Sequence, residues 1–356
     1  MYCGSCLRDN ALASALIARG HDVVLAPVYT PTLTDERNVS EQRVFFGGIS
    51  VYLEQHMPLF RHTPWLLDRI WDWGPMLKLA SKRQIKVDPA FLGGMTVSML
   101  QGAEGHQAKE VDKLVHWLRH EPSFDAISLP FTLLIGLAKP LREALGVPIA
   151  CTLQGEDLFL EILHEPWKTQ ALDLIRRQIG DVDLFMPVSS YYRTFMAGYL
   201  GIPDAKMRVV PLGISLGGYD WRSAPDAQRP RPVGFFGRIA PEKGLHVLVE
   251  AYHVLKHKTA MPLRLVAGGY LGPEHQAYYD GIRRRVSELG LDAEFSYAGS
   301  VDREAKQALL RSFDVMSMPA TYDEPKGLTL LEAMASGVPV VQPGRGSFTE
   351  IVERTG

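Results

Sequence analysis

The stretch VGFFGRIAPEKGLHVLVEAYHVLKHKTAMPLRLVAGG, residues 233–269, decides the fold of this 356-residue chain. It begins with an apolar run at 233–238 that predicts a buried strand, and it ends with a second such run at 263–269. Between them, residues 245–257 carry apolar side chains at helical spacing. A strand, a helix and a second strand in this order form the repeating unit of a parallel sheet that is covered by helices.

The same alternation continues on both sides of this unit. Toward the C-terminus we expect strands at 295–300, 314–320 and 338–344 and helices at 277–290, 303–313 and 328–337. Toward the N-terminus we expect strands at 21–28, 124–130, 147–155, 184–189 and 208–213 and helices at 111–120, 133–146 and 191–201. Both halves of the chain therefore predict parallel sheets.

The Gly, Pro, Ser and Asp residues of 214–232 interrupt the alternation, which is typical of a linker. We expect a first domain at 1–213, with an irregular insertion at 36–108, and a second domain at 233–356. A chain of this length suits two cores better than one. The predicted fold class is α/β, with two Rossmann-like doubly wound domains that face each other across a cleft. Such sheets bind ligands outside the carboxyl ends of their strands.

The composition is that of a globular protein with little net charge. Lys and Arg (38 residues) against Asp and Glu (40) give a net charge of −2, which leaves no electrostatic footprint for nucleic acid. No stretch approaches the ~20 consecutive apolar residues of a membrane span, and the first residues do not resemble a basic-then-apolar leader. The cysteines Cys3, Cys6 and Cys151 do not suffice for a disulfide scaffold. We therefore expect a cytoplasmic protein without a nucleic-acid partner or a transmembrane segment.

A polar loop followed by a helix start makes the strongest local signal, in PATYDEPKGLTLLEAMASGVPVV at 319–341. Glu324 lies on the predicted loop, and the helix that begins around Gly327 carries Glu332. Free N–H groups and the dipole at a helix start suit a phosphate. Carboxylate oxygens accept hydrogen bonds from the vicinal hydroxyls of a sugar or a ribose. The stretch therefore predicts a site for a ligand with both phosphate and hydroxyl groups.

A second loop presents two cations directly after the strand of 233–238. Gly237 lets the backbone turn, and Arg238 and Lys243 follow before the next helix. Two cations beside a strand end suit a diphosphate, because charge-assisted hydrogen bonds contribute roughly 1.5–3 kcal/mol each. The alternative is that both cations merely pair with Glu242 and nearby acids. The loop alone does not decide between these interpretations.

Several motifs, in one order, resemble the retaining, GT-B-fold glycosyltransferases of family 4. EPKGLTLLE resembles the E-x7-E signature of that family, GRIAPEKG its G-R-x-x-x-x-K-G donor loop, and GSFTEIV its following G-x-x-E turn. The segments VSSYYRTFM…RVVPLGI and GHDVV are similar to its last N-domain segment and its first helix-to-strand step. Because the matches cover nearly the whole chain in family order, together they are more specific than any single motif.

The resemblance implies a role for each residue of the two loops. Arg238 and Lys243, after the turn at Gly237, would hold the diphosphate of a nucleotide sugar and stabilise it as it leaves. Glu324 would face the hydroxyls of the transferred sugar. Glu332 would accept the hydroxyls of the ribose. The catalytic residues implied are thus Glu324, Arg238 and Lys243.

Backbone amides complete the implied donor site. The amides near Lys326, Gly327 and Leu328 would lie at the sugar and the phosphate, and the loop around Gly4 would approach the phosphates from across the cleft. Negative charge builds on the diphosphate as the sugar–phosphate bond breaks, so fixed donors stabilise the transition state more than the ground state. The reaction then requires no metal and no cofactor. We expect the Asp-Val-Asp at 181–183, which precedes a strand, to be a solvated turn.

In the first domain, the strand of 147–155 ends where many members of the family carry a histidine. This chain has Gln154 there, which can bind a sugar hydroxyl but cannot act as an acid or a base at neutral pH. Glu156 and Asp157 are nearby alternatives. Retaining transfer also needs no protein base if an oxygen of the leaving phosphate takes the proton of the acceptor. The sequence predicts a cleft contact at these three residues without choosing a base.

The opening CGSC poses a separate question, because thiol oxidoreductases also place C-x-x-C at a helix start, where the dipole lowers the pKa of a thiol. No compact redox domain closes within the next hundred residues, and a zinc site would need four ligands. We interpret CGSC as a small-residue turn that lines the cleft. Redox regulation is a minor hypothesis, which predicts activity that is lost on oxidation and restored by a thiol.

Both ends of the chain predict elements that are missing from the domains. Met1 falls in the loop that should follow a first strand, and EIVERTG precedes the closing helices expected of the second domain. We therefore expect truncation at both ends. The predicted function is metal-independent, retaining transfer of a hexose from a nucleotide sugar to an unidentified glycan, lipid or small-molecule acceptor. The alternatives are a non-catalytic sugar-nucleotide-binding protein, a sugar-nucleotide epimerase and, remotely, a C-x-x-C thiol oxidoreductase.

Overall fold

A computed structural model describes residues 4–46, 89–221 and 230–355 of the chain. The chain divides into two compact units. The N-terminal unit is Leu12–Pro211, and the C-terminal unit combines Met1–Ala11 with Leu212–Gly356. The boundary at 211–212 lies beside the linker expected from 214 onward. Most of the insertion expected at 36–108 lies outside the described residues.

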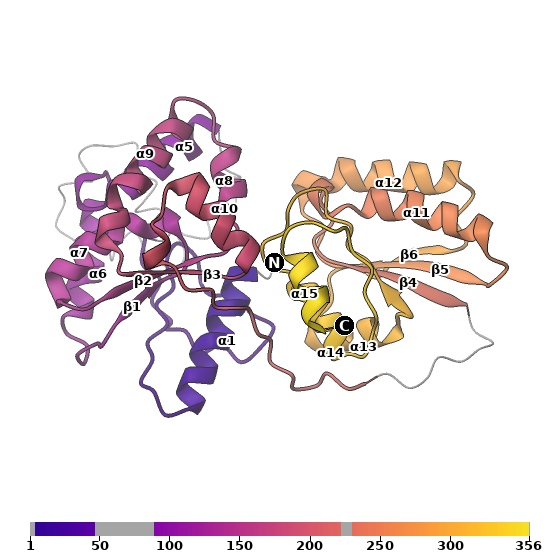
Figure 1. The fold of residues 1–356 in the computed structure, drawn as a ribbon, viewed down its shortest axis with the longest axis horizontal. Helices are drawn as coiled ribbons and strands as arrows, with labels where there is room; N and C mark the ends of the chain where they lie inside the picture. Colours follow the sequence, from indigo (N-terminus) through magenta and orange to yellow (C-terminus); the bar gives the residue numbers. More distant parts are fainter. Residues whose placement is uncertain (1–3, 47–88, 222–229, 356) are drawn as a thin grey trace, which may run out of the picture. The chain divides into compact units, whose positions relative to one another are not determined.

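The sheet of the C-terminal unit has four parallel strands in the order β6-β5-β4-β7. These strands are β4 (Arg231–Phe236), β5 (Leu263–Gly268), β6 (Phe295–Tyr297) and β7 (Val315–Met316). The helices are α11 (Leu245–Lys258), α12 (Gln276–Glu288), α13 (Arg303–Ser312), α14 (Leu328–Ala335) and α15 (Ser347–Thr355). Helices α11 and α12 cover one side of the sheet, and α13 and α14 cover the other (Figure 1). This arrangement confirms the parallel α/β fold predicted from 233–269.

Close packing on both sides holds this sheet in place. Phe235 of β4 and Leu265 of β5 are fully buried, as is Val249 of the covering helix α11. On the opposite side, the ring of Phe313 packs directly on Gly234, where a Cβ would lie 2.1 Å from a ring carbon. A glycine in the middle of the strand therefore lets the chain after α13 approach the sheet closely.

The sheet of the N-terminal unit has three parallel strands in the order β1-β2-β3. These are β1 (Ile127–Leu129), β2 (Ile149–Leu153) and β3 (Leu184–Pro187). The helices are α1 (Gly4–Ala18), α5 (Pro89–Leu100), α6 (Ala108–Leu118), α7 (Ala138–Leu145), α8 (Asp157–Glu161), α9 (Trp167–Gln178) and α10 (Ser190–Leu200). Helix α1 begins in residues grouped with the C-terminal unit and ends in the N-terminal unit. Short 3₁₀ helices lie at 102–104, 132–137, 179–181, 204–206, 241–243 and 273–275.

Three expected strands and one region expected to be irregular differ in the structure. Within the described residues, the strand expected at 21–28 forms only isolated bridges, from Leu25 to Ser40 and from Val28 to Phe45. The strand expected at 338–344 likewise forms only an isolated bridge, from Val340 to Met316. The strand expected at 208–213 is an extended segment beside β3, with the N–H of Val210 donating to the Pro187 carbonyl at 3.0 Å. Helix α5 lies in the region expected to be irregular. Its apolar residues lie on several sides of the helix, so the sequence shows little helical periodicity. Such a helix needs neighbours that cover it, and α9 packs closely against it.

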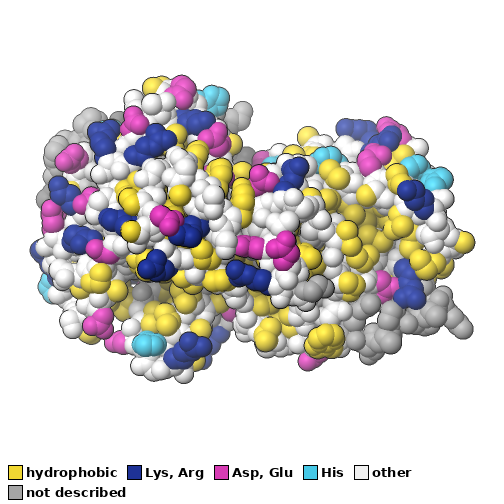
Figure 2. Space-filling model, in the orientation of Figure 1, with side chains coloured by type: hydrophobic (Ala, Val, Ile, Leu, Met, Phe, Trp, Pro, Cys, Tyr) yellow, Lys and Arg dark blue, Asp and Glu magenta, His cyan; other side chains and the backbone are white. Residues whose placement is uncertain are grey.

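Within the residues that the structure describes, no helix combines the length and the apolar character that crossing a bilayer requires. Figure 2 shows Lys and Arg side chains interspersed with Asp and Glu over the face in view. This mixture agrees with the small net charge of the sequence.

Candidate functional site

The loops that follow β4 and β7 bring Lys243 and Glu324 together. Lys243 Nζ donates to Glu324 Oε2 at 2.6 Å and to the Tyr322 hydroxyl at 2.5 Å. The Tyr322 hydroxyl in turn donates to the same glutamate oxygen. The N–H of Thr321 donates to the carbonyl of Glu242 at 2.9 Å, which joins the two loops through their backbones. Because β4 and β7 are neighbours in the sheet, residues far apart in sequence share one polar cluster.

This cluster keeps Glu324 ionised although it is buried. Its side chain is 7% exposed and that of Lys243 is 18% exposed. Burial opposes ionisation, but the charge of Lys243 and the hydrogen bonds from Lys243 and Tyr322 outweigh it and lower the pKa of Glu324. The pKa of Tyr322 is raised, by burial first and then by the Glu324 charge, so its hydroxyl stays a donor. The cluster therefore contains one cation, one anion and one neutral hydroxyl.

We expect the variant Tyr322→Phe to destabilise the protein at pH 7 more than at acidic pH. The lowered pKa of Glu324 means that its carboxylate stabilises the fold above the ordinary value of 4.5, and that this contribution disappears as the pH falls through the folded-state pKa. Removing the hydroxyl removes a donor and raises that pKa. The expected loss in free energy of unfolding is about 1–2 kcal/mol at pH 7. Urea unfolding at pH 7 and at several values below 4.5 measures the difference.

Tyr252→Phe is the matched control for this variant. Its hydroxyl also donates to a glutamate, Glu294, at 3.1 Å, but that carboxylate is 27% exposed and is paired with Lys256 on the surface. We expect a smaller loss with little dependence on pH. A Tyr322→Phe effect that stays constant across the pH series would contradict the assigned coupling to Glu324.

Arg238 lies beside this cluster and pairs with Glu242. The Arg238 side chain is 42% exposed, and ion pairs at such positions contribute little to stability. The pairing with Glu242 that the sequence left open is therefore present for Arg238. Lys243 pairs instead with Glu324, on the neighbouring loop.

The start of helix α14 faces the same loop. Gly327 is its N-cap, with φ of 69°, a left-handed conformation that favours glycine. The N–H of Lys326 donates to Glu324 Oε1 at 3.3 Å, so this amide already has an acceptor within the protein. Leu328 begins the helix. Gly237, at the end of β4, donates its N–H to the Gly268 carbonyl at 3.1 Å and so extends the sheet ladder.

Gly4, Ser5 and Cys6 of the opening CGSC start a helix instead of forming the expected turn. Helix α1 begins at Gly4, and Cys3 lies outside the described residues. Ser5 Oγ accepts a hydrogen bond from Lys326 Nζ at 3.2 Å. Cys6 is half-buried in the first turn of the helix. The redox hypothesis for the two thiols stays a prediction.

Glu332 belongs to a second polar cluster in the C-terminal unit. Its Oε1 accepts from Lys306 Nζ at 2.7 Å and from the Tyr219 hydroxyl at 2.9 Å. The Glu332 side chain is 12% exposed. The E-x7-E signature therefore places its two glutamates in separate clusters, each with a lysine and a tyrosine.

In the N-terminal unit, Gln154 follows directly after β2 and is 2% exposed. Its Nε2 donates to the Pro130 carbonyl at 2.7 Å, which determines how the amide is oriented. Its Oε1 is buried and has no hydrogen-bond partner in the part of the chain that the structure describes. A buried acceptor without a donor costs about 1–3 kcal/mol. Gln154 therefore offers an acceptor for a hydroxyl at the carboxyl end of β2.

Glu156 ties together the loops around Gln154. Its carboxylate accepts from the N–H and the hydroxyl of Thr132, each at 3.2 Å, and from the N–H of Gln154 at 2.8 Å. Burial raises the pKa of Glu156 although these hydrogen bonds oppose the rise. Asp157 accepts from the Tyr192 hydroxyl at 2.6 Å, and its pKa is also raised, chiefly by burial. Glu156 thus links the loops that follow β1 and β2, whereas Asp157 lies nearer the surface.

The Asp-Val-Asp stretch at 181–183 lies at the opposite, amino end of this sheet. Asp183 Oδ2 accepts from the Ile149 N–H at 2.7 Å and from Arg142 at 2.5 Å. The expectation that it precedes a strand is confirmed, because β3 starts at Leu184. The Asp183 side chain is 44% exposed, in agreement with a solvated turn, and it also links the start of β2 to helix α7.

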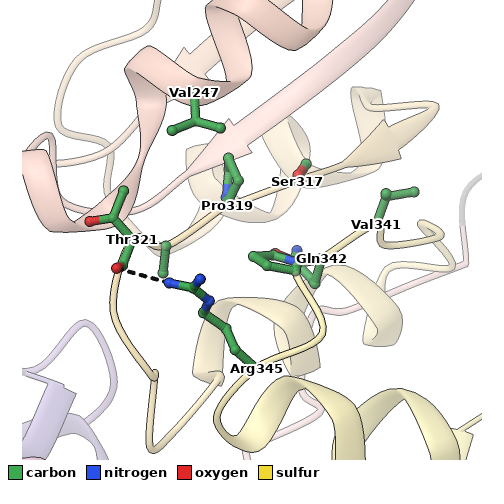
Figure 3. Close-up of a pocket in the computed structure, with 9 residues that line it drawn as sticks. Val247, Ser317, Pro319, Thr321, Val341, Gln342 and Arg345 are labelled. Atoms are coloured by element: carbon green, nitrogen blue, oxygen red, sulfur yellow. Dashed lines mark hydrogen bonds between the residues drawn. The ribbon is translucent and has the colours of Figure 1, made fainter.

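A pocket of about 540 Å³ opens against the loop that follows β7 (Figure 3). Arg345 reaches across it and donates to the Thr321 carbonyl at 2.9 Å, and Gln342 accepts from the Met318 N–H at 3.2 Å. None of the predicted donor-site residues, all of which the structure describes, lines this pocket. Its lining residues are Val247, Ser317, Pro319, Ala320, Thr321, Val341, Gln342, Pro343 and Arg345.

Sequence reasoning missed the partners that hold the predicted residues. Tyr322 precedes Glu324 by two positions, and an acidic loop with one tyrosine gave no periodic signal. Lys306 lies on the inner face of α13 and is 5% exposed. Lysine is rarely buried without a partner, so a lysine on the inner face of a predicted helix was a signal that sequence analysis could have used. Tyr219 falls in the expected linker. Lys306 and Tyr219 reach Glu332 only through tertiary contacts, whereas Tyr322 contacts Glu324 within one loop.

Two family models match this chain, and together they cover most of it. A model described as "Glycosyl transferase 4-like domain" matches residues 10–213, and one described as "Glycosyl transferases group 1" matches residues 221–356. The two matches meet close to the boundary between the two units.

Curated relatives match the chain over part of their length. An uncharacterised glycosyltransferase, YqgM of Bacillus subtilis, is 27% identical over 66% of this chain and 63% of its own length. A GDP-mannose-dependent phosphatidylinositol monomannoside mannosyltransferase of Mycobacterium tuberculosis is 29% identical over 50% of this chain and 49% of its own. The matched parts therefore span about half to two thirds of these relatives.

Solved structures share the architecture. The HepE protein of Anabaena, in complex with UDP and glucose, has a TM-score of 0.57 and 21% identity, over 70% of this chain and 66% of its own. A sucrose-phosphate synthase of Thermosynechococcus elongatus has a TM-score of 0.56 and 21% identity, over 69% and 63%. At these identities the likeness concerns the fold, which is GT-B. With its fold, its motifs and both matching models, the chain belongs to the group 1, family 4-like glycosyltransferases.

Proposed function

We propose that this protein transfers a sugar from a nucleoside diphosphate sugar to a hydroxyl acceptor, with retention of configuration and without a metal. The single observation that carries the proposal is the juxtaposition of Lys243 with Glu324, beside Arg238, at the carboxyl ends of β4 and β7. Two cations and a buried carboxylate at this edge of a parallel sheet suit a diphosphate and the hydroxyls of a sugar. The UDP and glucose in the complex of the neighbour HepE support this ligand class.

In this proposal the diphosphate replaces the carboxylate partner of Arg238. That pair is exposed, so exchanging Glu242 for a phosphate oxygen costs little. Lys243 keeps its hydrogen bonds to Glu324 and Tyr322 and contacts the diphosphate with its third N–H group, since an ammonium has three donors. The amides at Gly327 and Leu328 and the first turn of α1 at Gly4 add donors for the sugar and the phosphates.

Glu324 and Glu332 divide the hydroxyl recognition between them. Glu324 is ionised and accepts hydroxyls of the transferred sugar, while Glu332 accepts those of the ribose. In the N-terminal unit, Oε1 of Gln154, which has no hydrogen-bond partner among the described residues, accepts a hydroxyl of a substrate. Glu156 holds the Gln154 backbone and is a positioning residue in this scheme.

The transfer reaction needs no protein base in this proposal. The bond between the anomeric carbon and the diphosphate oxygen breaks, and its electron pair stays on the diphosphate, where Arg238 and Lys243 stabilise it. The acceptor oxygen bonds to the anomeric carbon on the same face. The acceptor proton passes to the departing phosphate oxygen. Gln154 takes no part in proton transfer, because an amide cannot titrate at neutral pH.

A ligand screen tests the donor site. We expect UDP, GDP or ADP, or one of their sugar esters, to stabilise the protein by about 2.7 kcal/mol at 100 times its Kd, measured as a thermal shift. The same compound should transfer its sugar to a hydroxyl acceptor, and NMR of the product should show the anomeric configuration of the donor.

The other outcomes identify the alternatives. Stabilisation without turnover would indicate a non-catalytic sugar-nucleotide-binding protein. Interconversion of the donor sugar without transfer would indicate an epimerase. If none of these compounds shifts the unfolding temperature, the proposed donor site is wrong.

A further inference from the structure

The carboxylate of Glu332 is held on one of its two oxygens only. Lys306 Nζ and the Tyr219 hydroxyl both donate to Oε1, at 2.7 and 2.9 Å. Among the described residues, nothing donates a hydrogen bond to Oε2. A carboxylate oxygen can accept two hydrogen bonds, so Oε2 has its full capacity for a ligand.

The lysine in this cluster is unusual because it is buried. The Lys306 side chain is 7% exposed and projects from α13 toward α14. A buried ion pair carries a desolvation penalty that its attraction often fails to offset, so apolar residues would hold two helices together at least as well. The pair is therefore poorly explained by helix packing alone.

Tyr219 reaches Glu332 because α13 holds the segment on which it lies. Arg303 donates to the Gly217 carbonyl at 3.0 Å, and Gln307 donates to the same carbonyl at 3.0 Å. Arg311 donates to the Gly218 carbonyl at 3.1 Å. The guanidinium of Arg303 also lies 5.5 Å from the centre of the Tyr219 ring. The side chains of one helix thus fix the backbone and the ring that present the hydroxyl.

We propose that Lys306 and Tyr219 are positioning residues that orient Glu332 for recognition of the ribose. They occupy Oε1 and direct Oε2 toward the two vicinal hydroxyls of the nucleoside. This inference rests on the proposed function. It adds that ribose recognition depends on a buried lysine and on a tyrosine from the segment that precedes β4.

Calorimetric titration with seven probes tests the inference. The probes are UDP, GDP and ADP, their 2′-deoxy counterparts, and inorganic pyrophosphate, which lacks the nucleoside. We expect the wild-type chain to bind the ribonucleotide that it prefers about ten-fold or more tightly than the deoxy form, as for a hydrogen bond to a charged group. In Tyr219→Phe this ratio should fall to about two, while the affinity for pyrophosphate stays unchanged.

Three further variants complete the experiment. Lys306→Met should abolish the preference for the ribonucleotide, and Lys306→Arg should restore part of it. Tyr252→Phe, with its hydroxyl on the remote Glu294, should leave all affinities at the wild-type level. Because Tyr219→Phe keeps the ring beside Arg303, it provides a test even if Lys306→Met does not fold.

Two results would overturn the inference, and they can be told apart. The first is that the variants weaken the binding of ribonucleotide, deoxynucleotide and pyrophosphate equally, or that the wild type has no preference for the ribonucleotide. Lys306 and Tyr219 then have only a structural role, and the proposed function survives. If neither the nucleotides nor pyrophosphate binds the wild type, the proposed function and this inference both fail.

Discussion

Replacing Lys243 with methionine is expected to lower kcat for sugar transfer by a factor of about 10² to 10³, the size of effect seen when one fixed donor to a developing charge is removed. The variant removes the cation proposed to stabilise the leaving diphosphate. It also leaves Glu324 buried without its 2.6 Å partner, so the pKa of Glu324 should rise. A donor-saturated transfer assay measures the first effect, and the acid limb of the pH–rate profile measures the second.

Lys256→Met is the control for this variant. Lys256 pairs with Glu294 at the same distance of 2.6 Å and in the same unit, but the lysine side chain is 38% exposed. We expect its removal to change kcat by less than a factor of two and stability by less than about 1 kcal/mol. If Lys243→Met retains a third or more of the wild-type kcat, the diphosphate is not held where we propose.

Gly244→Ala is expected to cause a large loss of stability in the C-terminal unit. Gly244 ends the loop that carries Lys243, with φ of 79°, and a Cβ there would lie 1.9 Å from the Pro319 carbonyl oxygen. Backbone can relieve this clash only by moving, and Pro319 leads into the loop of Glu324. We expect the free energy of unfolding to fall by about 3–4 kcal/mol in urea unfolding of the full chain, from clash and left-handed strain together.

Gly290→Ala separates the two causes. Gly290 also has a left-handed φ, of 66°, but nothing lies within 4 Å of a Cβ built there. Its alanine variant should therefore lose only the conformational part, about 1 kcal/mol. Equal losses in the two variants would mean that the close approach of the two loops does not exist in solution.

The fold was predictable between residues 233 and 337 because the strands and helices there carry their own periodic signals, whereas the strand expected at 338–344 is only a bridge and most of the expected turn at GSFTEIV lies in helix α15. The elements expected around 233–269 and at 277–290 correspond to β4, α11, β5 and α12. Prediction failed where the pattern was ambiguous. The run at 89–100 is apolar on all sides and gave no helical period, yet it forms α5 because neighbouring elements cover it.

The candidate site was predictable to the extent that its residues follow strands. Arg238, Lys243 and Glu324 each come directly after a predicted strand, and parallel strands place their carboxyl ends along one edge of a sheet. Their partners could not be predicted in the same way. Which side chain pairs with Lys243 depends on β7 lying next to β4, and strand order is not encoded by local spacing.

From the amino-acid order alone follow the α/β class, the parallel strands, the family and the residue types that a nucleotide sugar requires, because these depend on periodicity and on short-range motifs. The folded chain alone decides that Lys243 pairs with Glu324, that Tyr219 donates to Glu332, and that Gln154 keeps a buried acceptor without a donor among the described residues. The physical reason is that hydrogen bonding and burial depend on distances between residues that the backbone brings together from remote positions. No local pattern in the sequence contains those distances.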